Sequence, residues 1–217
     1  MITNASEDSV GPGAVNTQRM LQSLGRGDII PQVTKLQRIE EVKQNAPPRP
    51  TFEPRDRVGQ RELVRWEADL DRQTRAIKES TVRPQERAGL KVHLCSLVAP
   101  DSPAGDWMPV YIHSKLMIVD DVFTTHGSAN INTRSMQVDS ELNIAHEWAS
   151  VTKALRRRLW DLHTAGKGAQ DDPGEAFAEW QKIITENRDR QGESVKGAPY
   201  APLVEFYYDK ASLKNID

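Results

Sequence analysis

The clearest pattern in the chain is a helical one over residues 61–79. Leu63, Trp66, Leu70 and Ile77 recur at helical spacing there, and charged residues occupy most positions between them. This spacing places the apolar side chains on one face of a helix and the charges on the other. We expect this amphipathic helix to pack its apolar face on a sheet.

Period-two and β-branched patterns predict strands further along the chain. Residues 110–119 are rich in β-branched and aliphatic side chains, which is typical of a strand. Asp120 and Asp121 then predict a turn, and 122–125 predict the returning arm of a hairpin. We expect two more strands, one within 92–97 and one within 142–148.

Two helices are expected in the last third of the chain, at about 151–163 and 173–188. Asp172 and Pro173 are typical of an N-cap and a first helical position, so they mark where the second helix begins. The apolar residues expected to face inward are Val151, Leu155, Leu159 and Leu162 in the first helix and Phe177, Trp180 and Ile184 in the second.

The first 60 residues differ from the rest. They are rich in Asn, Ser, Gly and Pro, with four prolines between 47 and 54 that stop helices and remove strand donors. A short helix is expected only around 33–43. We therefore predict an irregular arm or linker at 1–60 and a folded half-domain at 61–217.

Composition narrows the functional classes. The 217 residues include 29 basic and 31 acidic ones, for a net charge of -2, which argues against nucleic-acid binding through bulk charge. No run approaches the roughly 20 apolar residues of a membrane helix. The start of the chain has no basic and apolar leader, which predicts no Sec-type signal peptide. A single cysteine, Cys95, excludes an intrachain disulfide and is expected to be a small buried hydrophobe.

Candidate chemistry gathers between 110 and 147. His113 and Lys115 lie two apart in a predicted strand, so both side chains leave the same face. Ser128 and Asn130 then offer a hydroxyl and an amide directly after a glycine, and Glu141 offers a carboxylate further on.

These residue types match what cleavage of a phosphodiester needs. An imidazole can attack phosphorus or protonate a leaving oxygen, and an ammonium can hold the non-bridging oxygens. An amide and a hydroxyl can complete that cradle without charge. A carboxylate on the far ring nitrogen can set the tautomer of the imidazole. The positive charge comes from lysine and imidazolium, so we expect neither a metal nor another cofactor.

Two stretches of sequence carry a resemblance to a known family. HSKLMIVD, beginning at His113, and GSAN, beginning at Gly127, together resemble the HKD motif of the phospholipase D superfamily. With DSELNI further on, the region 110–148 is similar to the second HKD block of eukaryotic-type phospholipases D, a type also found in some bacteria.

The resemblance implies an α/β fold in which a mixed β-sheet is sandwiched by helices. It also implies an active site where two HKD motifs meet, with one histidine phosphorylated and the other protonating the leaving alcohol before it activates water. The roles implied for this chain are His113 as general acid/base, Lys115 and Asn130 on the phosphate oxygens, Ser128 in support of the phosphate, Glu141 on the far ring nitrogen of His113, and Asp120 as a structural member of the motif.

The chain departs from such enzymes because it has one HKD block. The other four histidines lack a lysine two residues on, so we expect half of a catalytic site. Three interpretations stay open: the C-terminal half of a split or truncated phospholipase D, a one-motif phosphodiesterase or nuclease that forms a symmetric dimer, and a catalytically incomplete regulatory or phosphate-binding module.

We favour the first of these interpretations. It predicts hydrolysis of glycerophospholipid headgroup esters at a membrane surface, through a phosphohistidine, with a second HKD-bearing half from another chain or a symmetric copy. Bacterial enzymes of this kind include antibacterial effectors of the type VI secretion system. Export by a non-Sec route is therefore an alternative to the cytoplasm as the default location.

Other conspicuous residues have simpler interpretations. His126 is expected to be a surface or packing histidine, and Trp107 and Met108 to be packing residues before the motif strand. The run of three arginines at 156–158 is expected to form a solvated helix face.

Overall fold

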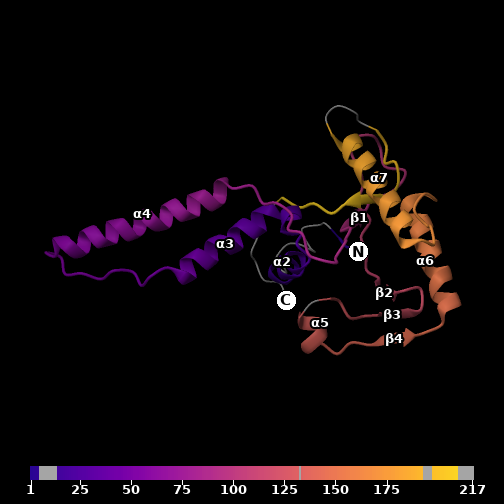
Figure 1. Cartoon of the computed structure of the whole chain (residues 1–217), viewed down its shortest axis with the longest axis horizontal. Coiled ribbons are helices and arrows are strands. Elements are labelled where there is room, and N and C mark those ends of the chain that lie inside the picture. Colours follow the sequence, from indigo (N-terminus) through magenta and orange to yellow (C-terminus); the bar gives the residue numbers. More distant parts are fainter. Residues whose placement is uncertain (5–13, 132, 193–196, 210–217) are drawn as a thin grey trace. The chain divides into compact units, whose positions relative to one another are not determined.

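The computed structural model describes residues 1–4, 14–131, 133–192 and 197–209. They form two compact units (Figure 1). Of these described residues, the first unit contains 1–4 and those from 89 to 207, and the second contains 14–88, 208 and 209. No helix within these described stretches is both long enough and apolar enough to cross a lipid bilayer.

The described part of the chain combines helices with short strands in small sheets, so the predicted α/β class is confirmed. The helices are α2 (Ala14–Ser23), the 3₁₀-helix η1 (Gly27–Ile29), α3 (Pro31–Asn45), α4 (Arg57–Glu79), α5 (Thr133–Gln137), α6 (Ala149–Thr164) and α7 (Pro173–Gln191). The strands are β1 (Cys95–Leu97), β2 (Lys115–Val119), β3 (Phe123–Gly127), β4 (Asn143–His146) and β5 (Leu203–Glu205).

The second unit is built on a hairpin of α3 and α4 (Figure 1). The expectation that α4 covers a sheet is wrong, because its half-buried apolar face packs on α3. Residues 1–60 are also more ordered than expected, since the described part contains both α2 and α3 and buries Ile30 and Val33. The boundary expected at residue 60 falls inside α4. The division into 1–60 and 61–217 therefore stays a prediction, beside the different division of the structure.

The first unit has its core where α7 covers the antiparallel pair β1–β5. The core residues are Cys95, Trp180, Ile183, Ile184, Ala201 and Leu203. Cys95 is fully buried in its strand, as predicted. Asp172 caps α7 by accepting from the Glu175 backbone at 2.8 Å, and Pro173 is its first residue, which confirms the predicted helix start.

The HKD region forms a separate three-stranded antiparallel sheet in the order β2–β3–β4. Asp120 and Asp121 both have positive φ, near 52° and 54°, as a tight hairpin turn of the type I′ class requires. The predicted turn and returning strand are therefore confirmed. The predicted strand at 110–119 begins only at Lys115, because the backbone of Ile112 pairs with the side-chain amide of Asn4 instead of with β3.

Helix α6 packs on β3 through polar side chains. Thr124 of β3 and Thr152 of α6 are fully buried and share a hydrogen bond of 2.8 Å. The predicted inward face is therefore partly wrong, since Val151 and Leu162 are exposed while Thr152 and Arg156 face inward. The buried face of the helix is therefore marked by Thr152 and Arg156, and Leu155 and Leu159 are half-buried.

Candidate active site

The strand register aligns three site positions in one row across the sheet. Lys115 of β2 pairs with Gly127 of β3, and Gly127 pairs with Asn143 of β4. Cross-strand partners share a face of a sheet, so this row lies on a single face. His113 lies two residues before the start of β2, and the segment 128–130 directly follows the end of β3. The structure therefore brings both parts of the motif to one end of the sheet.

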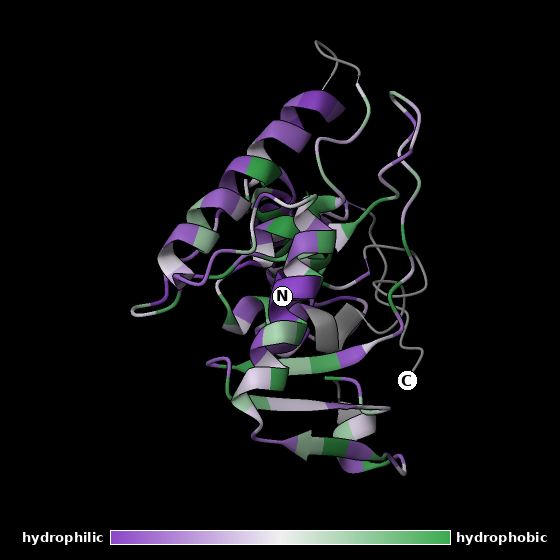
Figure 2. Ribbon diagram, turned by 90° about the vertical axis from the view of Figure 1, so that its right-hand side faces the viewer, coloured by the Kyte–Doolittle hydropathy of each residue, from purple (hydrophilic) through white to green (hydrophobic). Residues whose placement is uncertain are grey.

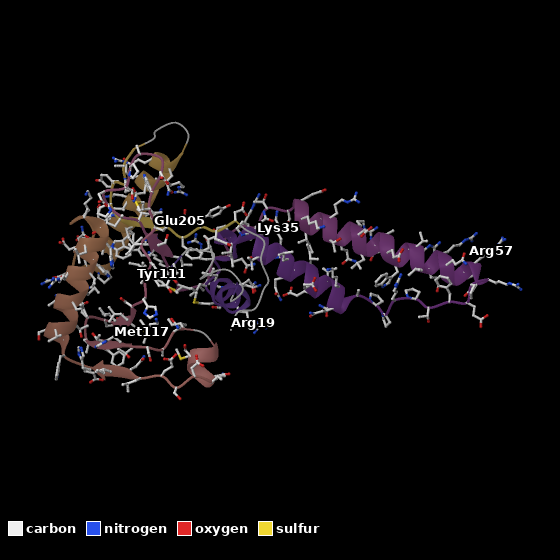
Figure 3. All side chains as sticks on the ribbon, turned by 180° about the vertical axis from the view of Figure 1, so that it is seen from behind. Arg19, Lys35, Arg57, Tyr111, Met117 and Glu205 are labelled. Atoms are coloured by element: carbon white, nitrogen blue, oxygen red, sulfur yellow. The ribbon has the colours of Figure 1, made fainter. Side chains whose placement is uncertain are left out.

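His113 and Lys115 are held by few contacts. The ammonium of Lys115 donates to the backbone carbonyl of His113 at 2.9 Å, so the two residues are close. The His113 side chain is exposed, and its ring lies 6.2 Å from the ring of Tyr111 in a nearly parallel arrangement. Figure 3 labels Tyr111 in this stretch and Met117 further along β2. Both motif residues are accessible to a ligand or to a second protein surface.

The loop after β3 is fastened to the residues before β4. Ser128 donates its hydroxyl hydrogen to Glu141 Oε2 at 2.5 Å, and the hydroxyl oxygen accepts from the Leu142 backbone at 3.0 Å. The backbone N–H of Ser128 donates to the Leu142 carbonyl at 3.1 Å. A hydroxyl has one hydrogen, so in this arrangement Ser128 has none left to donate to a phosphate. The predicted contact between Glu141 and His113 stays a prediction.

Asn130 and Asp120 lie at opposite ends of the hairpin. Asn130 is exposed and follows Gly127, the partner of Lys115, so it belongs to the end of the sheet that carries His113. Asp120 lies in the turn at the other end, five residues beyond Lys115, which is about 16 Å along a strand. The geometry therefore separates Asp120 from a ligand held by Lys115 and leaves it at most an indirect part in the site.

The carboxylate of this turn that is held by an ion pair belongs to the next residue, Asp121. Its two oxygens accept from Arg156 Nε at 2.6 Å and Nη2 at 2.7 Å, and the Arg156 guanidinium also contacts Asp171 and lies over the Trp160 ring. Hydrogen bonding from Arg156 holds the pKa of Asp121 below its usual value. The prediction of a solvated arginine run is correct for Arg157 and Arg158 but wrong for Arg156, which is 5% exposed.

Sequence reasoning also missed Asn143. Its side-chain Oδ1 accepts from the backbone N–H of Ala129 at 3.2 Å, which ties the loop after β3 to β4. A Cβ atom at Gly127 would lie 2.3 Å from this Oδ1 and 2.2 Å from the Leu142 carbonyl. Gly127 therefore leaves the space that the Asn143 amide occupies. Gly127 was the sequence signal that could have revealed this contact, because glycine often occurs in a strand where another part of the chain comes close to the backbone.

Some of the remaining predictions for this region are confirmed and others are wrong. His126 is exposed and shares the sheet face of Leu116 and Ile144, opposite the Lys115 face. Trp107 is half-buried and donates to the Gly197 carbonyl at 2.9 Å, as a packing residue does, but Met108 is exposed, which contradicts a packing role. Within the described part of the chain, no group of three or more metal-ligating side chains comes together.

Comparisons with known proteins agree on one family. The family described as "Cardiolipin synthase, PLD-like domain" matches residues 62–162. Phospholipase D alpha 4 of Arabidopsis thaliana is 47% identical over 70 residues, which cover 29% of this chain and 9% of that protein. Phospholipase D beta 1 of the same plant is 49% identical over 70 residues, covering 26% of the chain and 6% of the relative.

A relative from another organism gives the same result. Phospholipase D C of Dictyostelium discoideum is 37% identical over 71 residues, covering 25% of this chain and 4% of that protein. No solved structure matches the chain. Residues 62–162 are therefore similar to the PLD-like domain, and a shorter stretch of the chain is similar to phospholipases D. It spans less than a tenth of the length of these curated relatives.

Proposed function

We propose that this chain is one half of a phospholipase D-type phosphodiesterase, which cleaves the headgroup ester of a glycerophospholipid together with a second HKD-bearing half. A histidine of the other half would attack phosphorus, and the bond from phosphorus to the headgroup oxygen would break. His113 would give its proton to that oxygen and then take a proton from the water that releases phosphatidic acid. Lys115 and Asn130 would hold the non-bridging oxygens.

The observation that carries the proposal is the arrangement of the HKD residues on an open face. His113, Lys115 and the segment 128–130 lie at the same end of the sheet, yet His113 and Asn130 are exposed. Phosphoryl transfer relies on charged groups that act where water is excluded. This chain therefore supplies one wall of a site, and a second wall is required to close it.

The surroundings of the site support a protein partner. Large apolar side chains are exposed on both faces of the β2–β4 sheet and directly beside the site residues. Figure 2 shows hydrophobic segments on the strands at the bottom of the view. These exposed residues are Tyr111, Leu116, Met117, Val119, Ile131, Leu142 and Ile144. Apolar surface gathered in this way is typical of an interface, and the outer edges of β2 and β4 beside it have no neighbouring strand among the described residues.

The test is headgroup release by the chain together with the polypeptide that carries the second HKD motif. Phosphatidylcholine vesicles containing ethanol are the substrate, and phosphatidic acid and phosphatidylethanol are measured by mass spectrometry. His113→Gln is expected to lower both products by about 10²- to 10⁴-fold. His126→Gln is the matched control, because His126 is exposed on the opposite face of the same sheet. Equal effects of the two substitutions would refute the proposed site.

The same assay distinguishes the other interpretations. A symmetric one-motif enzyme would show activity from the chain alone, with specific activity rising as the chain concentration rises through its dimerisation range. A binding module would show no turnover with any partner.

A further inference from the structure

The side chain of Asn143 has a defined orientation beside the phosphate-binding residues. It lies on the same face as Lys115, one strand away across Gly127. A backbone N–H can only donate, so the atom of the amide that faces Ala129 at 3.2 Å must be the oxygen. The amide nitrogen, Nδ2, is therefore directed away from Ala129.

The two donors of Nδ2 have no protein partner among the residues that the structure describes. Asn143 is exposed, so these donors are accessible. Ser128, the residue that the sequence suggested as a neutral donor, already donates its hydrogen to Glu141. Asn143 is thus a neutral donor on the Lys115 face that remains available.

We propose that Asn143 is a phosphate-binding residue of this site, in addition to its hold on the loop after β3. Its Oδ1 positions the loop through Ala129, and its Nδ2 donates to a non-bridging oxygen of the phosphodiester held by Lys115. This inference rests on the proposed function, because it presumes that the phosphate binds at Lys115. A neutral donor suits the position, since it contacts the anion without raising the charge next to an ammonium.

Two substitutions separate the two roles of the side chain. Asn143→Asp keeps an oxygen that accepts from Ala129 but replaces the donor by a negative charge. Asn143→Ala removes both the acceptor and the donor. Asn45→Asp, in α3 of the other unit, is the matched control for a change of one charge.

The experiment is a titration of the chain with inorganic phosphate, followed by the backbone amide signals of residues 113–130 in ¹⁵N–¹H NMR. Asn143→Asp is expected to keep the hydrogen-bonded shift of the Ala129 amide and to weaken phosphate binding about tenfold or more. Asn143→Ala is expected to move that amide signal upfield and to weaken binding less. Asn45→Asp is expected to change neither.

The outcomes keep this inference apart from the proposed function. If Lys115→Ala removes phosphate binding while Asn143→Asp binds as tightly as the unchanged chain, the inference is overturned and the proposed function stands. If the unchanged chain shows no phosphate-dependent shifts around Lys115, the inference is overturned, and the proposed function is decided separately by the headgroup-release assay with the second HKD half. An Ala129 amide that does not respond to Asn143→Ala overturns the positioning role.

Discussion

The ion pair between Asp121 and Arg156 makes a prediction that separates two neighbouring aspartates. Asp120 and Asp121 share the β2–β3 turn and both have positive φ, so asparagine fits the backbone of either position. Of these two aspartates, Asp121 is the one that accepts hydrogen bonds from the buried guanidinium of Arg156. We expect Asp121→Asn to destabilise the fold and Asp120→Asn to have little effect.

The expected loss of stability in Asp121→Asn depends on the hydrogen bonds that Arg156 keeps. Removing one partner of a buried ion pair costs about 3–5 kcal/mol when the other charge is left uncompensated. Here Arg156 keeps the Gln170 carbonyl at 2.9 Å and Asp171 at 3.1 Å, so part of its charge stays paired. We expect a loss of about 2 kcal/mol in the free energy of unfolding, or a Tm lower by about 4–8 °C. Asp120→Asn is expected to change stability by less than about 0.5 kcal/mol.

The stability that Asp121 contributes depends on pH with a definite sign. The pKa of Asp121 is depressed in the folded state, so its contribution is fully present above the unfolded pKa of about 3.9. The contribution is lost as the pH falls through the lower, folded value. The stability gap between the unchanged chain and Asp121→Asn is therefore expected to close below about pH 4.

Urea unfolding followed by circular dichroism between pH 3 and pH 7 measures both effects. The reasoning is refuted if Asp120→Asn costs as much as Asp121→Asn, or if the gap between Asp121→Asn and the unchanged chain is the same at pH 3 and pH 7.

Two further predictions concern close packing. Gly127→Ala is expected to lower the Tm by several degrees, because its Cβ would lie 2.2 Å from the Leu142 carbonyl and force β3 and β4 apart. Gly197→Ala, whose Cβ would meet open space, is the control in the same thermal melt. Asn187→Ala is expected to cost about 3 kcal/mol in urea unfolding, because the buried amide makes three hydrogen bonds that hold the β5 segment to α7. Gln181→Ala, exposed on the same helix, is expected to cost less than about 0.5 kcal/mol, and equal losses at the two positions would contradict this reading.

Local patterns in the sequence predicted most of the elements. The Asp172–Pro173 start of α7 and the Asp120–Asp121 turn were predictable because capping and turn chemistry act within a few residues. The late start of β2 was not predictable, because it depends on Asn4, which is more than a hundred positions away and holds the backbone of Ile112.

The candidate site was predictable in its residue types and less so in its contacts. That His113, Lys115 and Asn130 lie at one end of the sheet was predictable from their spacing, and the strand register agrees with it. The roles of Asn143 and Arg156 depend on which face of a strand or helix meets a neighbour. A run of three arginines gives no sign of which one turns inward, because successive residues of a helix differ by about 100°.

The central claim is that His113 lies at the reacting phosphate and protonates the leaving oxygen. The most direct measurement compares His113→Ala on two lipids that differ only in the leaving group, phosphatidylcholine and phosphatidyl-p-nitrophenol, with the second HKD half present. Nitrophenolate leaves without a proton, so we predict a loss of at least about 10²-fold on phosphatidylcholine and a much smaller loss in the first burst of nitrophenolate. Equal losses on both lipids, or no loss on either, would contradict the claim.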